Sequence, residues 1–185
     1  MEIVTKEEFL QRIEEFMKRI FDGAVFIYPT DTIYGLGCDG TNGNAVNRIR
    51  QMKGRLHGPF SVIAPSKGWI TANCEAGELD RLPGPYTLIL KIKNKDCVAD
   101  EVHPGRETLG VRIPNHWISA AVEEIGTPIV TTSVNKKDEP FMTSLDDIDA
   151  EIRNQVDFII NEGTITGRPS TLIDLTQKEK KVIER

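Results

Sequence analysis

Cysteine and histidine are scarce in this sequence, and neither follows a metal-binding or disulfide pattern. The three cysteines, Cys38, Cys74 and Cys97, are widely spaced and include no CxxC pair. The three histidines, His57, His103 and His116, share neither the spacing of a metal site nor that of a catalytic triad. We therefore expect reduced thiols, structural or surface histidines, and no metal site built from the protein's own side chains.

Long hydrophobic runs and a surplus of basic residues are also missing. No apolar run approaches the length of a membrane span, and the charged N-terminus MEIVTKEEFLQRIEEF does not resemble a signal peptide. The formal net charge of −5 argues against a general nucleic-acid-binding surface. We expect residues 1–185 to form a single cytoplasmic domain with no membrane partner, in which any anion site is a local cluster of positive charge.

The sequence also lacks a GxxxxGK[ST] loop, so a bound nucleotide would not be held by a Walker-type turn. Residues 35–40, GLGCDG, do spell GxGxxG. In a dinucleotide-binding fold those glycines follow the first strand directly, whereas here PTDTIY intervenes and no acidic residue follows the next expected strand. We therefore expect these glycines to serve tight turns and close approach of the backbone, and not nicotinamide binding.

Hydrophobic periodicity predicts a mixture of helices and strands. Thr5 and Glu8 form a capping box before apolar residues at helical spacing, which predicts a helix over 5–21. Further helices are expected over 44–52, ended by Gly54, and near 116–125 and 144–153. Apolar or alternating runs predict strands at 24–28, 60–64, 86–93, 109–113, 128–132, 157–160 and 171–175. The combination predicts an α/β fold with a mixed sheet covered by helices.

Two polar pairs lie at the ends of these expected elements. Lys53 and Arg55 follow the helix over 44–52, and Ser133 and Asn135 follow the strand over 128–132. An ammonium beside a planar guanidinium suits phosphates or a carboxylate, and Ser and Asn two residues apart offer neutral donors and acceptors on one side. Taken alone, the basic pair is better explained as a solvated helix end favoured by the helix dipole.

Two charged residues in apolar or turn-forming surroundings also stand out. Arg112 lies in an otherwise apolar expected strand, where a cation either pairs with an acid or holds a ligand carboxylate. Asp31 lies in the segment PTDT, where it could help to hold magnesium or orient Lys53. A turn-forming aspartate explains it equally well.

Six blocks of sequence, in the same order as in a known family, resemble the YrdC-like proteins with their KxR…SxN signature. The blocks are YPTDTIYGLGCDG at 28–40, KGR at 53–55, PGPYTLIL at 83–90, TLGVRIPNH at 108–116, TTSVN at 131–135 and STLIDL at 170–175. The resemblance implies a twisted mixed β-sheet with flanking helices around a positively charged cavity. It also implies a nucleotidyltransferase, an L-threonylcarbamoyladenylate synthase that uses L-threonine, bicarbonate and ATP, releases pyrophosphate and supplies the t6A modification of tRNA.

The resemblance implies a role for individual residues, and it outweighs the simpler explanation of the basic pair. It assigns catalysis to Lys53, Arg55, Ser133 and Asn135. It assigns threonine binding to Thr32, Arg112, Ser133 and Ser170. It assigns ATP binding to Arg55, Thr108, Asn135, Thr143 and Arg185. Mg²⁺ is expected to accompany ATP, and a tRNA threonylcarbamoyltransferase is the expected downstream partner.

The sequence departs from the family pattern in the loops over 56–60 and 136–143, which puts the nucleotide contacts there in doubt. Two other functions remain open. A concave positive cavity could bind structured RNA, but the acidic chain lacks basic and aromatic stripes, so direct tRNA binding is expected to be weak or absent. A carbamoyl-adenylate-handling domain, like that of hydrogenase maturation factors, normally lies in a much larger chain.

Overall fold

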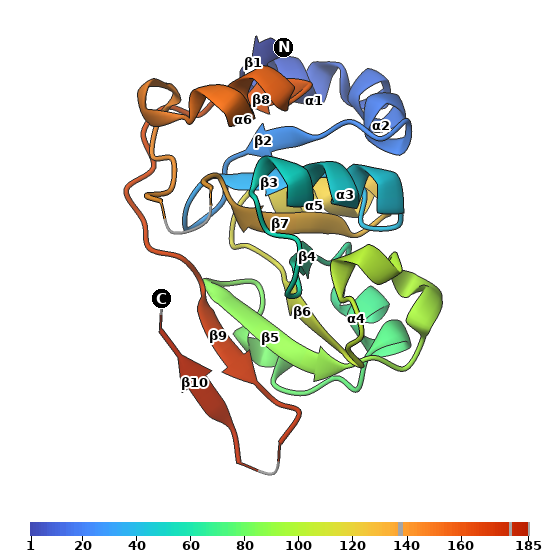
Figure 1. Ribbon diagram of the computed structural model, residues 1–185. Coiled ribbons are helices and arrows are strands. Elements are labelled where there is room, and N and C mark those ends of the chain that lie inside the picture. Colours follow the sequence, from blue (N-terminus) through green and yellow to red (C-terminus); the bar gives the residue numbers. More distant parts are fainter. Residues whose placement is uncertain (137–138, 178, 185) are drawn as a thin grey trace.

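The protein folds around one mixed β-sheet with helices on both faces (Figure 1). The structure is a computed structural model that describes residues 1–136, 139–177 and 179–184. Within these residues the strand order is β1-β8-β2-β3-β7-β4-β6-β5-β9-β10. The strands are β1 Glu2–Val4, β2 Phe26–Tyr28, β3 Gly35–Gly37, β4 Ser61–Ile63, β5 Tyr86–Lys91, β6 Thr108–Arg112, β7 Ile129–Ser133, β8 Phe158–Ile160, β9 Thr171–Asp174 and β10 Lys181–Ile183.

The helices pack against the sheet through two separate apolar cores. They are α1 Lys6–Gln11, α2 Ile13–Phe21, α3 Gly43–Met52, α4 Lys67–Asn73, α5 Ile118–Ile125 and α6 Ala150–Gln155, with short 3₁₀ turns at Leu79–Arg81, Lys95–Cys97, Asp100–Val102 and Leu145–Asp147. Side chains of α3 belong to one core, and those of α1, α2 and α5 belong to the other. Alternate residues around β2 enter alternate cores, because successive side chains of a strand point to opposite faces. This explains why the strand is apolar throughout.

Strand β7 joins the two halves of the sheet. Its residues Ile129, Val130 and Thr131 pair with β4, and its last residues, Thr132 and Ser133, pair with Leu36 and Gly35 of β3. The chain leaves β7 immediately after Ser133, at the point where the two halves meet. The fold therefore holds the start of the segment Ser133–Val134–Asn135 rigidly while leaving its side chains at a strand end.

Most of the predicted elements are confirmed to within a few residues, and the capping box of Thr5 and Glu8 is present. The predicted helix over 5–21 is wrong in one respect, because it breaks at Arg12 into α1 and α2. Gly54 adopts φ +59° directly after α3, as the predicted helix stop requires. The predicted helix over 144–153 is a 3₁₀ turn followed by the shorter α6. Sequence periodicity missed β1, β3, β10 and α4, which are all short.

The glycines of GLGCDG serve close packing in β3, and the last of them, Gly40, lies in a turn that the Asn42 N–H closes by bonding the Asp39 carbonyl oxygen at 3.2 Å. Gly35 and Gly37 lie in β3 and have no positive φ. A Cβ atom at Gly35 would lie 2.8 Å from the Tyr28 ring, and one at Gly37 would lie 2.3 Å from the Val130 carbonyl oxygen. Glycine is required here because the Tyr28 ring and the neighbouring strand approach the backbone so closely.

Candidate active site

A cavity of about 630 Å³ lies against one face of β6, β5 and β9. Its wall also includes the end of β7, the loop before β3 and the segment before β4. Six residues predicted from the sequence line it: Arg55, Thr108, Arg112, Ser133, Asn135 and Ser170. Three arginines, Arg55, Arg106 and Arg112, line the cavity with one carboxylate, Asp174. Cations thus outnumber carboxylates on the wall.

Lys53 is buried and fully hydrogen-bonded, unlike the solvated helix end that the basic pair suggests when taken alone. Its ammonium donates to the carbonyl oxygens of Ser133 at 2.6 Å and Asn135 at 2.7 Å, and to Asn135 Oδ1 at 3.0 Å. Burial and the neighbouring Arg55 lower the pKa of Lys53 to about 8. Lys53 therefore ties the end of α3 to the Ser133–Asn135 turn.

The Ser133–Asn135 turn is itself pre-organised. The Ser133 hydroxyl donates to Asn135 Oδ1 at 2.6 Å, and Asn135 Nδ2 donates to the Glu139 carbonyl oxygen at 2.6 Å. Both side chains line the main cavity and also a neighbouring cavity of about 520 Å³ that is lined by Lys53 as well. The turn thus forms a partition between two hollows, and Lys53 lies on the side away from the main one.

Arg55 lies on the wall of both cavities and has no carboxylate partner among the described residues. Its guanidinium donates to the Pro59 carbonyl oxygen at 2.9 Å and lies 5.3 Å from the centre of the Phe60 ring. Partial burial lowers its pKa, although an arginine stays charged. The ring and the carbonyl hold the guanidinium in place while leaving its charge uncompensated.

Arg112 is paired with Asp31, so the acidic-partner explanation of this buried cation is confirmed. The guanidinium donates to Asp31 Oδ1 at 2.5 Å and to the Thr32 hydroxyl at 3.2 Å. Asp31 Oδ2 accepts the Asn115 backbone N–H at 2.8 Å. The idea that Asp31 orients Lys53 is wrong, because its carboxylate is committed to Arg112. Arg112 Nε is buried without a partner, which leaves one donor of this side chain unsatisfied.

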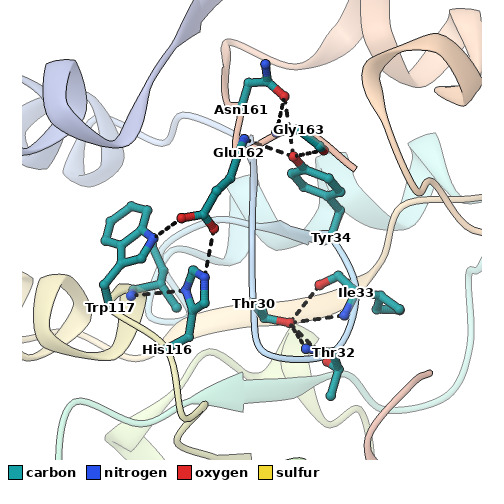
Figure 2. Close-up of polar contacts among 10 residues, drawn as sticks. Thr30, Thr32, Ile33, Tyr34, His116, Trp117, Asn161, Glu162 and Gly163 are labelled. Atoms are coloured by element: carbon teal, nitrogen blue, oxygen red, sulfur yellow. Dashed lines mark hydrogen bonds and ion pairs between the residues drawn. The ribbon is translucent and has the colours of Figure 1, made fainter. Parts of the chain in front are cut away.

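The loop that carries Asp31 and Thr32 is fixed by Thr30. The Thr30 hydroxyl donates to the Ile33 carbonyl oxygen at 2.7 Å and accepts the backbone N–H groups of Thr32 and Ile33 (Figure 2). This local hydrogen bonding is typical of threonine in turns. It sets the direction of the Thr32 side chain, which contacts Arg112 but is not itself among the residues lining the cavity.

Ser170 enters the cavity from the segment before β9, and its partner Thr87 was missed by the sequence analysis. The two hydroxyl oxygens lie 2.7 Å apart, and both side chains are buried on the cavity wall. The alternating sequence YTLILKIK places Thr87 on the same face as Ile89, and this pattern was the signal in the sequence that could have identified Thr87.

Thr108 and Gly110 lie on the neighbouring strand β6, where a Cβ atom at Gly110 would meet Ser61 Oγ at 2.4 Å.

Two of the predicted ligand residues that the structure describes, Thr32 and Thr143, do not line the cavity. Thr143 is not among the lining residues, because its hydroxyl donates to Asp147 Oδ2 at 2.6 Å and its N–H contacts the same carboxylate. Arg185 lies outside the described residues.

The described residues contain no group of three His, Cys, Asp or Glu side chains that could hold a metal ion. No described helix is long and apolar enough to cross a membrane.

Comparison with known proteins shows which family this chain resembles. A family model for Sua5/YciO/YrdC, described as "Telomere recombination", matches residues 18–185. A Thiobacillus denitrificans protein named threonylcarbamoyl-AMP synthase is 34% identical over 167 residues, which covers 83% of this chain and 85% of the relative. An "Uncharacterized protein YciO" from Escherichia coli is 29% identical over 180 residues, 92% of this chain and 87% of its own length.

A solved structure agrees with these sequence matches. Pyrococcus abyssi Sua5 complexed with L-threonine superposes with a TM-score of 0.86 at 28% identity and covers 98% of this chain. This chain spans 56% of the length of that Sua5 chain. The family model covers residues 18–185 and the synthase relative is 34% identical over 83% of the chain, so the chain belongs to the Sua5/YciO/YrdC family.

Proposed function

We propose that this protein is a threonylcarbamoyl-AMP synthase, which joins L-threonine, bicarbonate and ATP and releases pyrophosphate. The observation that supports this most directly is the arrangement of cations in one cavity. Arg112, beside Thr32 and Ser170, can receive an amino acid, while Arg55 and the Ser133–Asn135 turn can receive phosphates. The relatives include both named synthases and YciO proteins with no named activity, so this chain needs its own assay.

The amino-acid end offers donors and acceptors that match threonine. A planar guanidinium suits a carboxylate, and the buried Arg112 Nε still has an unused donor. The hydroxyls of Ser170 and Thr87 line the same wall and can bond the threonine hydroxyl. We assign the threonine site to Thr32, Arg112, Ser133 and Ser170, with Thr87 as an added neighbour.

The phosphate end offers a cation where negative charge would develop. The amine of threonine first attacks the carbon of bicarbonate to give a carbamate, with loss of water. A carbamate oxygen then attacks the α-phosphorus of ATP, and the bond to the pyrophosphate group breaks. This reaction needs positioning and fixed charge more than covalent chemistry by the protein. Arg55 can stabilise the phosphate charge, and Thr108 and Asn135 can position the nucleotide.

Mg²⁺ fits this site only as a companion of the nucleotide. Asp174 is the one carboxylate among the described lining residues, and its Oδ1 already accepts the N–H and hydroxyl of Thr176. Magnesium is commonly held by one or two carboxylates together with substrate phosphates. When bound, it would neutralise phosphate charge, and Asp174 Oδ2 is the protein oxygen that could approach it.

The direct test is incubation of the purified protein with ATP, bicarbonate and labelled threonine. We expect a labelled adenylate on chromatography and one pyrophosphate released per adenylate, with neither product formed when bicarbonate is removed. Labelled threonine recovered unchanged under all conditions would refute the proposal. Because the adenylate is an activated acyl donor, we propose that a transferase acting on tRNA consumes it.

The proposal also predicts how tRNA behaves. If the cavity is a small-molecule site, added tRNA should neither displace ATP nor change the rate of adenylate formation at near-physiological salt. Contacts with many nucleic-acid phosphates lose roughly three to five decades of affinity between low and near-physiological salt. Salt-resistant tRNA binding that displaces ATP would support an RNA-binding module instead.

A further inference from the structure

The connection from β8 to β9, residues 161–170, crosses from one half of the sheet to the other (Figure 1). We call it the strap. It contains no helix or strand, yet its last residues, Pro169 and Ser170, line the cavity. An irregular segment needs fixed points to place a side chain accurately, and the strap has two of them at its start.

The first fixed point is the hydroxyl of Tyr34, which bonds two backbone groups of the strap. It donates to the Gly163 carbonyl oxygen at 2.8 Å and accepts the Glu162 N–H at 3.0 Å (Figure 2). Asn161 Oδ1 accepts the Gly163 N–H at 3.1 Å, which closes the turn. The Tyr34 side chain is buried and also lines the cavity, two residues after Thr32. Burial raises the pKa of the phenol, so the group stays a neutral hydroxyl.

The second fixed point is the carboxylate of Glu162. Its two oxygens accept Trp117 Nε1 at 2.9 Å and contact His116 Nε2 at 2.8 Å (Figure 2). These two residues immediately precede α5, which is packed against the sheet. The start of the strap is thereby attached to a rigid helix as well as to the cavity loop.

Further along, the strap passes directly over the loop that carries Thr32. The Ile165 N–H bonds the Thr143 carbonyl oxygen at 2.9 Å. A Cβ atom at Gly167 would lie 1.8 Å from the Thr32 carbonyl oxygen, so the strap approaches this loop too closely for any side chain. Three residues later, Ser170 Oγ lies 2.7 Å from Thr87 Oγ1. The strap therefore contacts Thr32 and supplies Ser170, both at the amino-acid end.

We infer that Tyr34 and Glu162 are positioning residues that fix the strap over the amino-acid end of the cavity and so set amino-acid binding and selection, without contributing to nucleotide binding. This inference rests on the proposed function for its substrate. The physical reason is that loss of the Tyr34 hydroxyl leaves the Glu162 N–H and the Gly163 carbonyl without their partner. The strap is then released at its start, and Ser170 is held less accurately. Misplacement by about 1 Å can cost up to about a hundredfold in rate.

The test is Tyr34→Phe, which keeps the ring on the cavity wall and removes only the hydroxyl. We expect the KM for threonine to rise by about tenfold or more, with the KM for ATP changed less than about twofold. The amide hydrogens of residues 162–165 should exchange faster with solvent than in the wild type. Tyr28→Phe is the matched control, because it also removes a buried hydroxyl, which donates to the Val130 carbonyl at 3.0 Å and does not contact the strap.

Glu162 allows a graded second test. Glu162→Gln keeps an oxygen that can accept from Trp117, so it should affect the threonine KM less than Glu162→Ala. The inference would be overturned if Tyr34→Phe raised the KM for threonine and the KM for ATP equally, or if Tyr28→Phe shifted them in the same way as Tyr34→Phe. It would also be overturned if the strap amide hydrogens of Tyr34→Phe exchanged faster while threonine binding was unchanged. If the wild type makes no adenylate, the proposed function fails; unchanged exchange in Tyr34→Phe would separately refute the anchoring of the strap.

Discussion

Arg112 at one end of the cavity has an acidic partner, whereas Arg55 and, behind the Ser133–Asn135 turn, Lys53 at the other end have none among the described residues. Arg112 lies beside its own counter-ion, and Asp31 partly opposes the lowering of its pKa by burial. Lys53 contacts only uncharged oxygens, and the neighbouring Arg55 adds to the lowering of its pKa. The end with Arg112 and Asp31 is therefore close to neutral, and the end with Lys53 and Arg55 carries positive charge that no described carboxylate compensates.

This difference indicates which ligand suits each end. A neutral arginine–aspartate pair suits a zwitterion, whose carboxylate can approach the guanidinium without adding net charge to a buried site. Two uncompensated cations suit a polyanion, which restores the missing negative charge when it binds. The amino-acid end is thus expected to select by hydrogen bonding and shape, and the phosphate end by charge.

The largest expected effect is on amino-acid selection. Threonine should be used best, serine should be poorer by about 1–3 kcal/mol for the missing methyl group, and valine should be rejected by about 10⁴-fold or more. Valine fails because the Ser170 and Thr87 hydroxyls can bond a threonine hydroxyl, whereas the valine methyl in its place offers neither a donor nor an acceptor. Competition between the three amino acids in the adenylate assay gives the ratios. Equal use of valine and threonine would show that this end does not read the hydroxyl.

Removing the counter-ion should harm the amino-acid end strongly. Asp31→Ala leaves Arg112 buried without a carboxylate, and breaking a buried pair costs about 3–5 kcal/mol of stability. Chemical denaturation measures this. The control is Glu15→Ala, which removes an exposed partner of Arg12 and should lower the stability much less, because exposed ion pairs are screened by solvent. If both variants lower the free energy of unfolding equally, the buried Arg112–Asp31 pair stabilises the protein no more than an exposed pair does.

The sequence predicted the parts of this arrangement that follow from local patterns. Apolar runs located the strands that carry Arg112 and Ser133, and Gly54 located the end of α3, so most of the candidate residues could be placed on their elements. β3 was missed because glycines in a sequence usually indicate a turn. The sequence does not show that the Tyr28 ring packs against these two glycines. Short elements such as β1 give too few residues for any periodicity to show.

The contacts between distant segments could not be predicted in the same way. Lys53 looked exposed because a helix end usually is, and only the fold shows that it meets residues 133 and 135. Asp31 and Arg112 are 81 residues apart, so no spacing rule joins them. Tyr34 was part of a recognised block, but its bonds to Glu162 and Gly163 depend on where the strap crosses.

At the phosphate end the two cations should separate into different roles. Arg55→Ala should lower the rate of adenylate formation by about 10²–10³ while the stability changes little, because its charge lies on the main cavity and is paired with no described carboxylate. Lys53→Met should also lower stability by about 1–3 kcal/mol, because the Ser133 and Asn135 carbonyls lose their buried donor. Arg153→Ala, on the exposed face of α6, is the control for losing one positive charge. Near-normal turnover in Arg55→Ala would remove it from the mechanism.

The smallest expected effect is a pH dependence that belongs to Lys53. Its pKa falls from an ordinary 10.5 to about 8 in the folded protein. The unfolded chain therefore binds more protons between these values, so the contribution of Lys53 to the stability of the unliganded protein should rise with pH from about 8 to about 10.5. Activity should fall over the same range, because a neutral amine has two hydrogens for three acceptors. Thermal unfolding of the wild type and Lys53→Met between about pH 7 and pH 10 isolates the contribution, and parallel curves for the two proteins would contradict it.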